Sequence, residues 1–328
     1  NDWLNGALLA GHTEDLRIRI KGNLSDFPLD GTEDVIFKIG GHARGAVLEF
    51  GKDWPRIEHI TGEFLIRGNK LEVKSPSATM LDARLQNVSV TMPDMMSDEL
   101  PLEIRGEAEA ASNVFLEFIQ QSPVRGYIDG FTDDITASGN GHLALFLRIP
   151  LLGGKRVQVA GNIRVQDNDI DLGEGVPMLR NTHGALSFTE SGMQASGVEA
   201  EILGGPASIN LQAAEGGAVH ATVQGRSDIE ALRISEPHPL LDYLHGGAEW
   251  DADINVVKRS AQVIVRSDLR GIGSDLPQPF AKHANEVVPL RMEKSAGTGK
   301  QDFITVRLGK LFSARLARRN ENGAMIVK

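Results

Sequence analysis

The sequence predicts an all-β protein whose sheet is elongated, curved and mostly antiparallel, with one or two short helices. Apolar and charged residues alternate with a period of two, as in Leu16–Lys21, where Leu, Ile and Ile alternate with Arg, Arg and Lys. Such strands bury one face and expose the other, which antiparallel sheets permit. The 36 glycines of the chain suit many tight turns. A recurring pattern, described below, indicates that the sheet is built from repeated hairpins.

Further strands are expected wherever the alternation recurs between Gly, Asn or Asp residues. In residues 35–39, for example, every second side chain is Val, Phe or Ile. The other candidate strands are 46–50, 63–67, 70–74, 83–91, 101–108, 142–149, 156–165, 169–172, 185–189, 193–196, 198–203, 207–213, 218–224, 249–256, 261–267 and 302–308.

Three stretches align without a gap: Gly62–Val73, Gly161–Leu172 and Gly184–Ala195. Each reads Gly, then alternating apolar residues, a short polar segment, and two more alternating apolar residues. We interpret each copy as one β-hairpin with its apolar side chains on one face. A lone hairpin is marginally stable in water, so the copies are expected to line up. About 20 strands spaced about 4.8 Å apart would form a sheet on the order of 80–100 Å long.

Two helical interruptions are predicted. Residues 112–121 carry an apolar stripe, with Ser112 as a candidate N-cap and Pro123 as a stop. The second covers 228–232 and 240–244 and would end at Gly246 and Gly247. Both are expected to cover an edge or a mouth of the sheet, with ordinary connectors as the alternative.

Composition excludes several classes of function. The net charge is −10 and there is no basic aromatic stripe, which argues against nucleic-acid binding. The basic residues Arg315, Arg318 and Arg319 are better explained as a solvated strand or helix face. The absence of cysteine excludes disulfides, thiolate zinc sites and cysteine nucleophiles. No run of 18 apolar residues occurs, and the chain opens without Met, so we expect a piece of a larger protein whose membrane anchor lies outside it.

Catalytic and metal-binding motifs are missing. The chain has no His-Glu-x-x-His, no phosphate-binding loop and no Gly-x-Ser-x-Gly. The run Asp167–Asp171 resembles the start of a calcium loop, but Leu172 and Met178 occupy positions that require Gly and Glu, so a polar hairpin turn is expected. Asp133 and Asp134 fit helix capping or a solvated loop. We therefore expect no enzyme activity, no cofactor and no metal.

Several motifs resemble those of the YhdP family, which comprises large AsmA-like envelope proteins of Gram-negative bacteria. The most specific motif is Val265–Lys282, which contains Ser-Asp-Leu-Arg-Gly and Leu-Pro-Gln-Pro. Trp3–Gly11, Gly22–Leu29 and Leu240–Trp250 are similar to further family motifs and follow the family order. The resemblance implies an inner-membrane anchor outside this chain and a periplasmic, taco-shaped open β-groove. It also implies that the groove carries phospholipid between the inner and outer membranes without catalytic residues.

On that basis we expect residues 1–328 to form a single groove segment with approximate sub-modules 1–110, 111–226 and 227–328. Phospholipid acyl chains would be the ligand, and other envelope proteins are candidate partners. For each candidate, the alternative is an ordinary sheet core, and the sequence does not determine which pleat faces inward. The candidate groove-lining residues are Ile18, Ile20, Phe64, Ile66, Leu71, Val73, Ile163, Val165, Ile170, Leu172, Leu186, Phe188, Ile209 and Leu211.

Two rival functions remain open from the sequence. A scaffold for outer-membrane assembly would bind extended peptides at an open sheet edge. An envelope enzyme or carbohydrate-binding solenoid would need carboxylates or aromatic residues clustered on one face, and the chain has only three Trp and two Tyr, widely spaced.

Overall fold

The structure is a computed structural model that describes residues 6–22, 36–128, 130–152, 156–173, 176–213, 218–257, 260–296, 301–321 and 324–327. Strands dominate, their pairing is antiparallel, and the sheet is open. The predicted all-β class is therefore confirmed. The family-like stretches Trp3–Gly11 and Gly22–Leu29 fall partly outside the described residues, as does Val35. Within the described residues, no helix is long and apolar enough to span a bilayer.

Two compact units divide the chain. The first contains residues 1–165 and 187–190, and the second contains 166–186 and 191–328. Strands β9 (Gln158–Asp171) and β10 (Leu179–Thr189) contribute residues to both. The predicted sub-modules 1–110, 111–226 and 227–328 remain a prediction.

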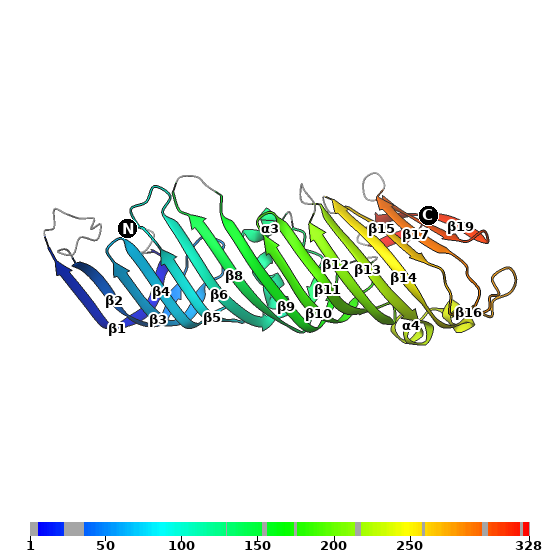
Figure 1. Ribbon diagram of the computed structural model, residues 1–328, viewed down its shortest axis with the longest axis horizontal. Helices are drawn as coiled ribbons and strands as arrows, with labels where there is room; N and C mark the ends of the chain where they lie inside the picture. Colours follow the sequence, from blue (N-terminus) through cyan, green and yellow to red (C-terminus); the bar gives the residue numbers. More distant parts are fainter. Residues whose placement is uncertain are drawn as a thin grey trace. The chain divides into compact units, whose positions relative to one another are not determined.

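Strands of the first unit follow one another in chain order (Figure 1). Each strand pairs antiparallel with the next as far as β6, which pairs with β8. The strands are β1 (Leu8–Lys21), β2 (Ile36–Leu48), β3 (Ile57–Arg67), β4 (Lys70–Met80), β5 (Ala83–Met92), β6 (Pro101–Ala111), β7 (Thr136–Ala137) and β8 (Asn140–Pro150).

Strands of the second unit also pair mainly with their neighbours in sequence. The exception is the short β16, which pairs with the first residues of β14, so that β15 pairs directly with β17. The strands are β11 (Gly192–Ile202), β12 (Gly205–Ala213), β13 (Val219–Asp228), β14 (Leu244–Val257), β15 (Ser260–Ser267), β16 (Ile272–Ser274), β17 (Leu290–Ala296), β18 (Gln301–Leu308), β19 (Phe312–Glu321) and β20 (Ala324–Val327). The basic stretch near residue 315 is therefore part of a strand.

The first repeat copy, Gly62–Val73, is a hairpin as predicted. Strands β3 and β4 meet at a turn formed by Gly68 and Asn69, and Gly68 has a φ of 55°. A left-handed residue at this position matches the twist of the two strands, and glycine adopts it without steric cost. The third copy, Gly184–Ala195, likewise runs through β10, a turn at 190–191, and β11.

The second copy is not a hairpin, so the prediction of a turn at 167–169 is wrong. Strand β9 runs unbroken from Gln158 to Asp171. Asp167 has a φ of 54°, and Asn168 is fully buried, with its Nδ2 donating to the carbonyl of Gln166 at 2.8 Å. One left-handed residue produces a local irregularity that the strand continues past, whereas a hairpin needs the chain to reverse.

Two other predicted breaks also lie within strands. Residues 46–48 belong to β2, which has register shifts beside Ala46, so 46–50 is not a separate strand. Segments 193–196 and 198–203 form most of the single strand β11, whose register shifts between Ala195 and Val198. Extra residues at such shifts interrupt the alternation in the sequence without ending the strand.

Helices form at both predicted places. They are α2 (Ser112–Gln120), α3 (Val124–Tyr127), α4 (Ile229–Ser235) and the 3-10 helix η3 (Pro239–Tyr243). Ser112 does not cap α2, because it is the first helical residue and the cap position is Ala111. Asp228 does cap α4, accepting hydrogen bonds from the backbone N–H of Glu230 and Ala231. Gly246 and Gly247 lie in β14 and do not end a helix.

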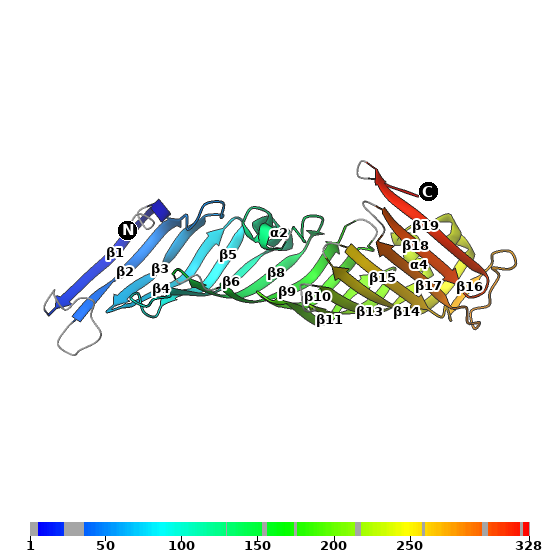
Figure 2. The same ribbon diagram turned by 90° about the horizontal axis from the view of Figure 1, so that it is seen from above.

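Helix α2 lies in the first unit, beside its strands (Figure 2), and packs there through its apolar stripe. Val114 is buried, and the ring of Phe115 lies against Gly141, where a Cβ would come within 2.9 Å of it. Phe118 contacts Trp54 with ring centroids 6.0 Å apart. The helix is thereby held between the ends of strands and the β2–β3 connection.

The buried apolar residues are mostly small. In the second unit, Ala200, Ile202, Ala207, Val223 and Ala252 form the core cluster. Alanine also dominates the other buried apolar positions, including Ala46, Ala78, Ala83 and Ala108 in the first unit. Large apolar side chains such as Phe, Leu and Ile are therefore mostly left at least partly exposed, which is unusual for a sheet with a closed core.

The Val265–Lys282 motif builds a pinned loop after β15. The Lys282 ammonium donates to the carbonyls of Leu269 at 2.7 Å and Ile272 at 2.6 Å, and burial lowers the pKa of this side chain. Gly271 has a φ of 100°, and a Cβ there would overlap the carbonyl oxygen of Gly247. The residues of this motif thus hold the backbone of one loop.

Candidate functional site

A continuous row of large apolar side chains crosses the first unit. Ile18 of β1 lies opposite Ile39 of β2, Ile39 opposite Ile66 of β3, Ile66 opposite Leu71 of β4, and Leu71 opposite Met92 of β5. Directly opposed residues of antiparallel strands point to the same side of the sheet. All five side chains therefore share one face.

A second row lies beside the first on this face. Phe64 is opposite Val73, Val73 opposite Val90, Val90 opposite Ile104, and Ile104 opposite Leu147 of β8. We call this side of the first unit the apolar face. From β1 to β8 it crosses six strand spacings of about 4.8 Å, or roughly 29 Å.

The apolar face is only partly covered. Ile18 is 60% exposed and Ile20, which lies opposite Phe37, is 52% exposed. Phe64, Ile66, Leu71 and Val73 are partly buried. None of these candidates is enclosed as a core residue would be, and each keeps surface that a ligand can contact.

The other pleat of the same strands is largely polar. Residues Arg19, Lys38 and Arg67 stand opposite one another across β1, β2 and β3. Leu65 is an apolar exception, placed between Gly40 and Glu72. The two sides of the first unit thus differ in chemistry, as the alternation in the sequence predicts.

The second unit also has cross-strand apolar rows, but unlike those of the first unit they include buried residues, namely Ala221, Val223 and Ala252. Ile209 of β12 lies opposite Val223, Val223 opposite Ala252, Ala252 opposite Val265, and Val265 opposite Met292. A parallel row runs from Leu211 through Ala221 and Ile254 to Val263. The candidates Ile209 and Leu211 therefore share a face.

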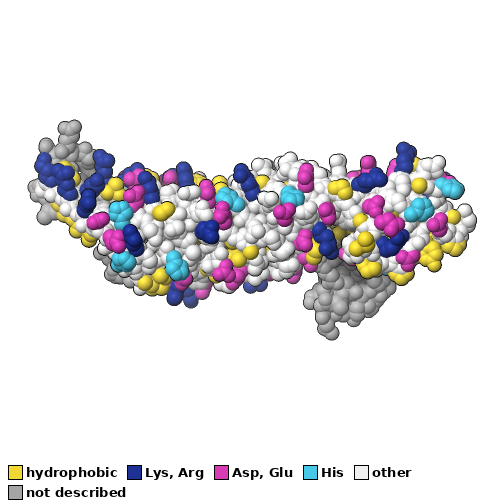
Figure 3. Space-filling model, turned by 90° about the horizontal axis from the view of Figure 1, so that it is seen from below, with side chains coloured by type: hydrophobic (Ala, Val, Ile, Leu, Met, Phe, Trp, Pro, Cys, Tyr) yellow, Lys and Arg dark blue, Asp and Glu magenta, His cyan; other side chains and the backbone are white. Residues whose placement is uncertain are grey.

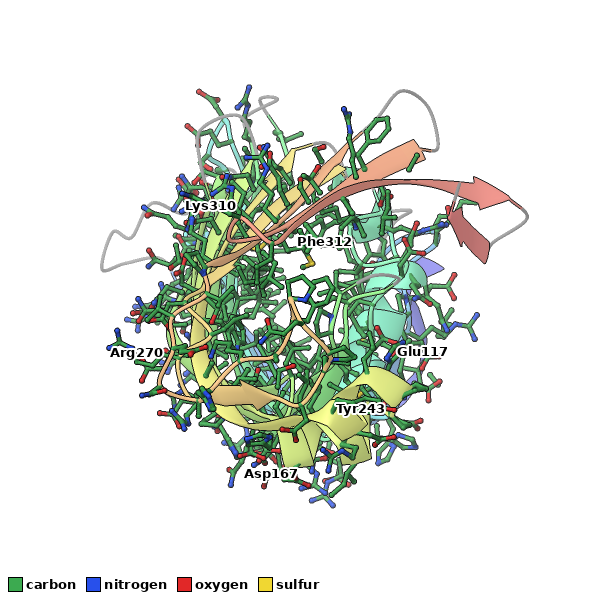
Figure 4. The ribbon with its side chains drawn as sticks, turned by 90° about the vertical axis from the view of Figure 1, so that its right-hand side faces the viewer. Glu117, Asp167, Tyr243, Arg270, Lys310 and Phe312 are labelled. Carbon is green, nitrogen blue, oxygen red and sulfur yellow. The ribbon has the colours of Figure 1, made fainter. Side chains whose placement is uncertain are left out.

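Figure 4 shows on which side this second face lies. Phe312 points to the inner side of the curved strands, and Arg270 and Asp167 point outward. Phe312 is paired with Leu308, which shares its pleat with Val306, the partner of Met292. The rows of the second unit therefore lie on its inner, concave side, which we call the concave face.

The opposite pleat of the second unit carries charged networks. The Arg266 guanidinium donates to Asp251 at 2.7 Å and to Asp253 at 2.6 Å, and the hydrogen bond to Asp253 contributes most to raising its pKa. His220 and Asn255 are hydrogen-bonded at 2.8 Å. Figure 3 shows a surface on which acidic and basic side chains are interspersed. The positive charge of Arg266 is thus balanced by neighbouring carboxylates on this pleat.

The remaining candidates lie on or beside β9 and β10. Ile163, Val165 and Phe188 belong to the first unit and are partly buried. The second unit contains Ile170 and Leu186, also partly buried, and Leu172, which follows β9 and is 39% exposed. The structure brings Phe188 against Gly161, and it does not join all of these side chains in a single pocket.

A hollow of about 570 Å³ lies in the first unit. Phe188 is the candidate residue that lines it, together with Gly161, Phe146 and Arg105. The Arg105 guanidinium stacks on the Phe146 ring, 4.7 Å from its centroid. The other lining residues are Asn87, Gly106, Glu107, Ala144, Leu145, Ala160, Asn162, Ser187 and Thr189.

Sequence reasoning missed several residues of the apolar face. Ile39, Val90, Met92, Ile104 and Leu147 complete its two rows. Their signal was present, because each follows the same alternation and all but Met92 lie within a predicted strand; Met92 is the residue after the predicted strand 83–91. The pairing register, which the sequence does not provide, is what places them beside the predicted residues.

Asp133, one of the two acidic residues considered in the sequence as a possible metal or acid–base site, forms an ion pair with arginine. Asp133 accepts two hydrogen bonds from Arg125, at 2.9 and 3.1 Å, and raises the pKa of that guanidinium. Over the described ranges, no group of three or more His, Asp or Glu side chains is arranged to hold a metal ion. The apolar faces are therefore the main candidate site.

Comparison with known proteins identifies the family that the sequence motifs suggested. The family described as YhdP protein matches residues 1–328. The "Intermembrane phospholipid transporter YhdP" of Escherichia coli (strain K12) is 23% identical over 301 residues, which cover 89% of this chain and 23% of that protein. The chain thus spans about a quarter of the length of this relative. No solved structure matches the chain. Because the family match extends over every residue, the chain belongs to the YhdP family.

Proposed function

We propose that the chain holds the acyl tails of phospholipids on its apolar faces and conducts the phospholipids between the inner and outer membranes. The observation that carries this proposal is the pair of cross-strand apolar rows in the first unit, whose members stay partly exposed. A metabolic enzyme would instead need a group of reactive side chains brought together in a cleft.

The dimensions of the apolar face suit an acyl tail. A tail spans half of a bilayer's hydrocarbon core of about 30 Å, or roughly 15 Å. The two rows together extend roughly 29 Å across the strands, so that one tail would occupy part of a longer track. Each CH₂ removed from water contributes about 0.8 kcal/mol. Many similar contacts hold the tail, and none of them forms a deep well that would stop its movement.

The name of the Escherichia coli relative supports phospholipid as the cargo, since that protein is described as an intermembrane phospholipid transporter. We place the present chain in the periplasm, as a segment of a larger protein anchored in the inner membrane. There the polar pleat faces water and the apolar faces receive lipid. Catalysis plays no part in this proposal, and other envelope proteins are candidate partners at the two membranes.

The first test measures lipid bound to the purified chain. Phospholipid in organic extracts is quantified by mass spectrometry for the native chain and for a variant with Phe64→Asp and Ile66→Asp. Two carboxylates on the apolar face should lower bound phospholipid at least fivefold, because each would lose its hydration against an acyl chain.

The matched control is Leu65→Asp, on the same strand and the opposite pleat. It should keep native lipid content, and circular dichroism should show that all variants remain folded. If the double variant folds and still carries the native amount of lipid, these positions do not contact the cargo. If the native chain itself yields no lipid after exposure to phospholipid vesicles, the proposed function is wrong.

The scaffold hypothesis has one supporting observation. All residues of β1 are exposed, including Leu8 at 55% and Leu16 at 56%. Among the described strands, β1 pairs with β2. Such an edge can accept an extended peptide. A chain that binds peptides through β1 and carries no lipid would favour that function over transport.

A further inference from the structure

One ion pair lies on the otherwise apolar concave face of the second unit. Lys294 of β17 stands opposite Val263 of β15 and Ile304 of β18. These two neighbours belong to the rows that include Ile254 and Leu316. By register Lys294 therefore points to the same side as the apolar residues, where the rows otherwise present Val, Ile, Leu, Ala, Met and Phe.

The partner of Lys294 is Asp302 of β18, on the same pleat. The Nζ–Oδ2 distance is 3.8 Å, and the side chains are only 19% and 13% exposed. Both residues lie next to the β17–β18 connection, which begins after Ala296. Among the described side chains on the paired strands of this face, Lys294 and Asp302 are the charged ones.

The geometry is that of a loose pair. A charge-assisted N–H···O bond measures about 2.7–2.9 Å, and Arg266 on the opposite pleat makes two contacts of that kind. The ammonium of Lys294 makes no hydrogen bond of 3.5 Å or less with any residue that the structure describes. Removing two charges from water is unfavourable unless good hydrogen bonds replace the lost hydration. This lysine retains donors for a further acceptor.

We propose that Lys294 binds the phosphate of a phospholipid head group, with Asp302 holding the ammonium in place when no lipid is present. This inference rests on the proposed function, because it assumes that acyl tails occupy the concave face. Tails would lie along Val263, Ile304 and their neighbours, and the phosphate would meet the ammonium at the strand ends. The ligand class is then a phosphate-bearing amphiphile, not any hydrocarbon.

The test compares two lipids with identical acyl chains, phosphatidylglycerol and diacylglycerol, of which only the first carries a phosphoglycerol head group. The chain is incubated with vesicles containing equal amounts of both, and the bound lipids are extracted and quantified. The native chain should prefer phosphatidylglycerol. Lys294→Met keeps an unbranched apolar side chain only one atom shorter and should lower this preference about fivefold, since a charge-assisted bond is lost.

Two further variants keep the test decisive. Asp302→Asn removes the competing carboxylate and should raise the preference for phosphatidylglycerol, which a merely structural ion pair would not do. Lys310→Met removes one positive charge from the exposed turn before β19 and should leave the preference unchanged. If Lys294→Met fails to fold, the direction of change in Asp302→Asn still decides.

Each outcome separates the two proposals. If the native chain binds both lipids and neither variant changes the ratio, the head-group site is wrong while the proposed function stands. If neither lipid binds, the proposed function itself is wrong, and the head-group site is not needed. Inorganic phosphate is added in a parallel experiment. If it saturates Lys294 without lipid and abolishes the preference at millimolar concentration, the site binds free phosphate and the inference is overturned.

Discussion

The ring of Phe188 lies so close to Gly161 that a Cβ on residue 161 would overlap the ring atoms Cζ, Cε1 and Cε2. Both residues belong to the first unit and line its hollow. The absence of a side chain at 161 therefore creates the space that the aromatic ring of the neighbouring strand occupies.

Gly161→Ala should destabilise the chain. The added methyl group must displace the Phe188 ring or the backbone of β9, and overpacking of this kind costs about 1–3 kcal/mol. Chemical denaturation measures the loss. The control is Gly126→Ala in α3, where a Cβ would meet nothing within 4 Å. Equal stability of the two variants would mean that Phe188 moves aside freely.

Lys282→Met should loosen the loop built by the Val265–Lys282 motif. The carbonyls of Leu269 and Ile272 would lose their common donor, and hydrogen bonds to charged groups contribute about 1.5–3 kcal/mol each. We expect faster proteolysis within 269–289 and a lower midpoint of denaturation. Lys310→Met changes the same charge at an exposed turn and should leave both unaltered. Unchanged proteolysis in Lys282→Met would show that the glycines alone hold the loop.

Thr182→Val should stabilise the chain. Thr182 is 1% exposed, and its Oγ1 has no hydrogen-bond partner among the described residues. A buried hydroxyl without a partner is unfavourable by about 1–3 kcal/mol, and valine has nearly the same shape. Thermal denaturation should show a higher midpoint for Thr182→Val. The exposed Thr61→Val on β3 should show almost none of this gain. A lower midpoint for Thr182→Val would reveal that the hydroxyl is satisfied.

Stability should fall on acidification partly through Glu190. Its carboxylate accepts the backbone N–H of Val159 at 2.9 Å, and this hydrogen bond is the main cause that lowers the pKa of Glu190 below 4.5. A lowered acid pKa means that the stabilisation is present above pH 4.5 and is lost as pH falls through the folded-state pKa. The difference in melting temperature between the native chain and Glu190→Gln should therefore shrink below pH 4.5. A difference that stays constant with pH would contradict this account.

Alternation in the sequence was sufficient for the fold class and for much of the apolar face. It predicted that Phe64, Ile66, Leu71 and Val73 lie on one side of a hairpin, and the pairing register of β3 and β4 confirms this. Neighbouring strands such as β5 and β6 were also predictable, because their apolar residues recur at every second position.

The sequence could not distinguish a turn from an irregular strand. Gly68-Asn69 and Asp167-Asn168 occupy the same place in aligned copies, and both contain a left-handed residue. The difference is that Asn168 is buried and bonded to its own strand, which depends on neighbours far away in sequence. The ion pair of Lys294 and Asp302 was hidden for a similar reason, since β17 was not predicted as a strand.

The glycines that open the repeat copies have a physical explanation that the alignment lacked. A Cβ on Gly62 would overlap the carbonyl oxygen of Lys74, and one on Gly184 would come within 2.8 Å of Val198. Together with Gly161 under Phe188, each marks a place where an adjacent strand approaches too closely for any side chain.

The small buried residues have a consequence for how such a protein changes over evolutionary time. Among the described residues, most of the buried apolar positions are filled by alanine, so that small side chains make up most of the enclosed packing between strands. Gain or loss of a two-strand segment would then disturb only the junctions on either side. A molecule of this kind can alter the distance it covers by duplicating or deleting hairpins, without redesigning what remains.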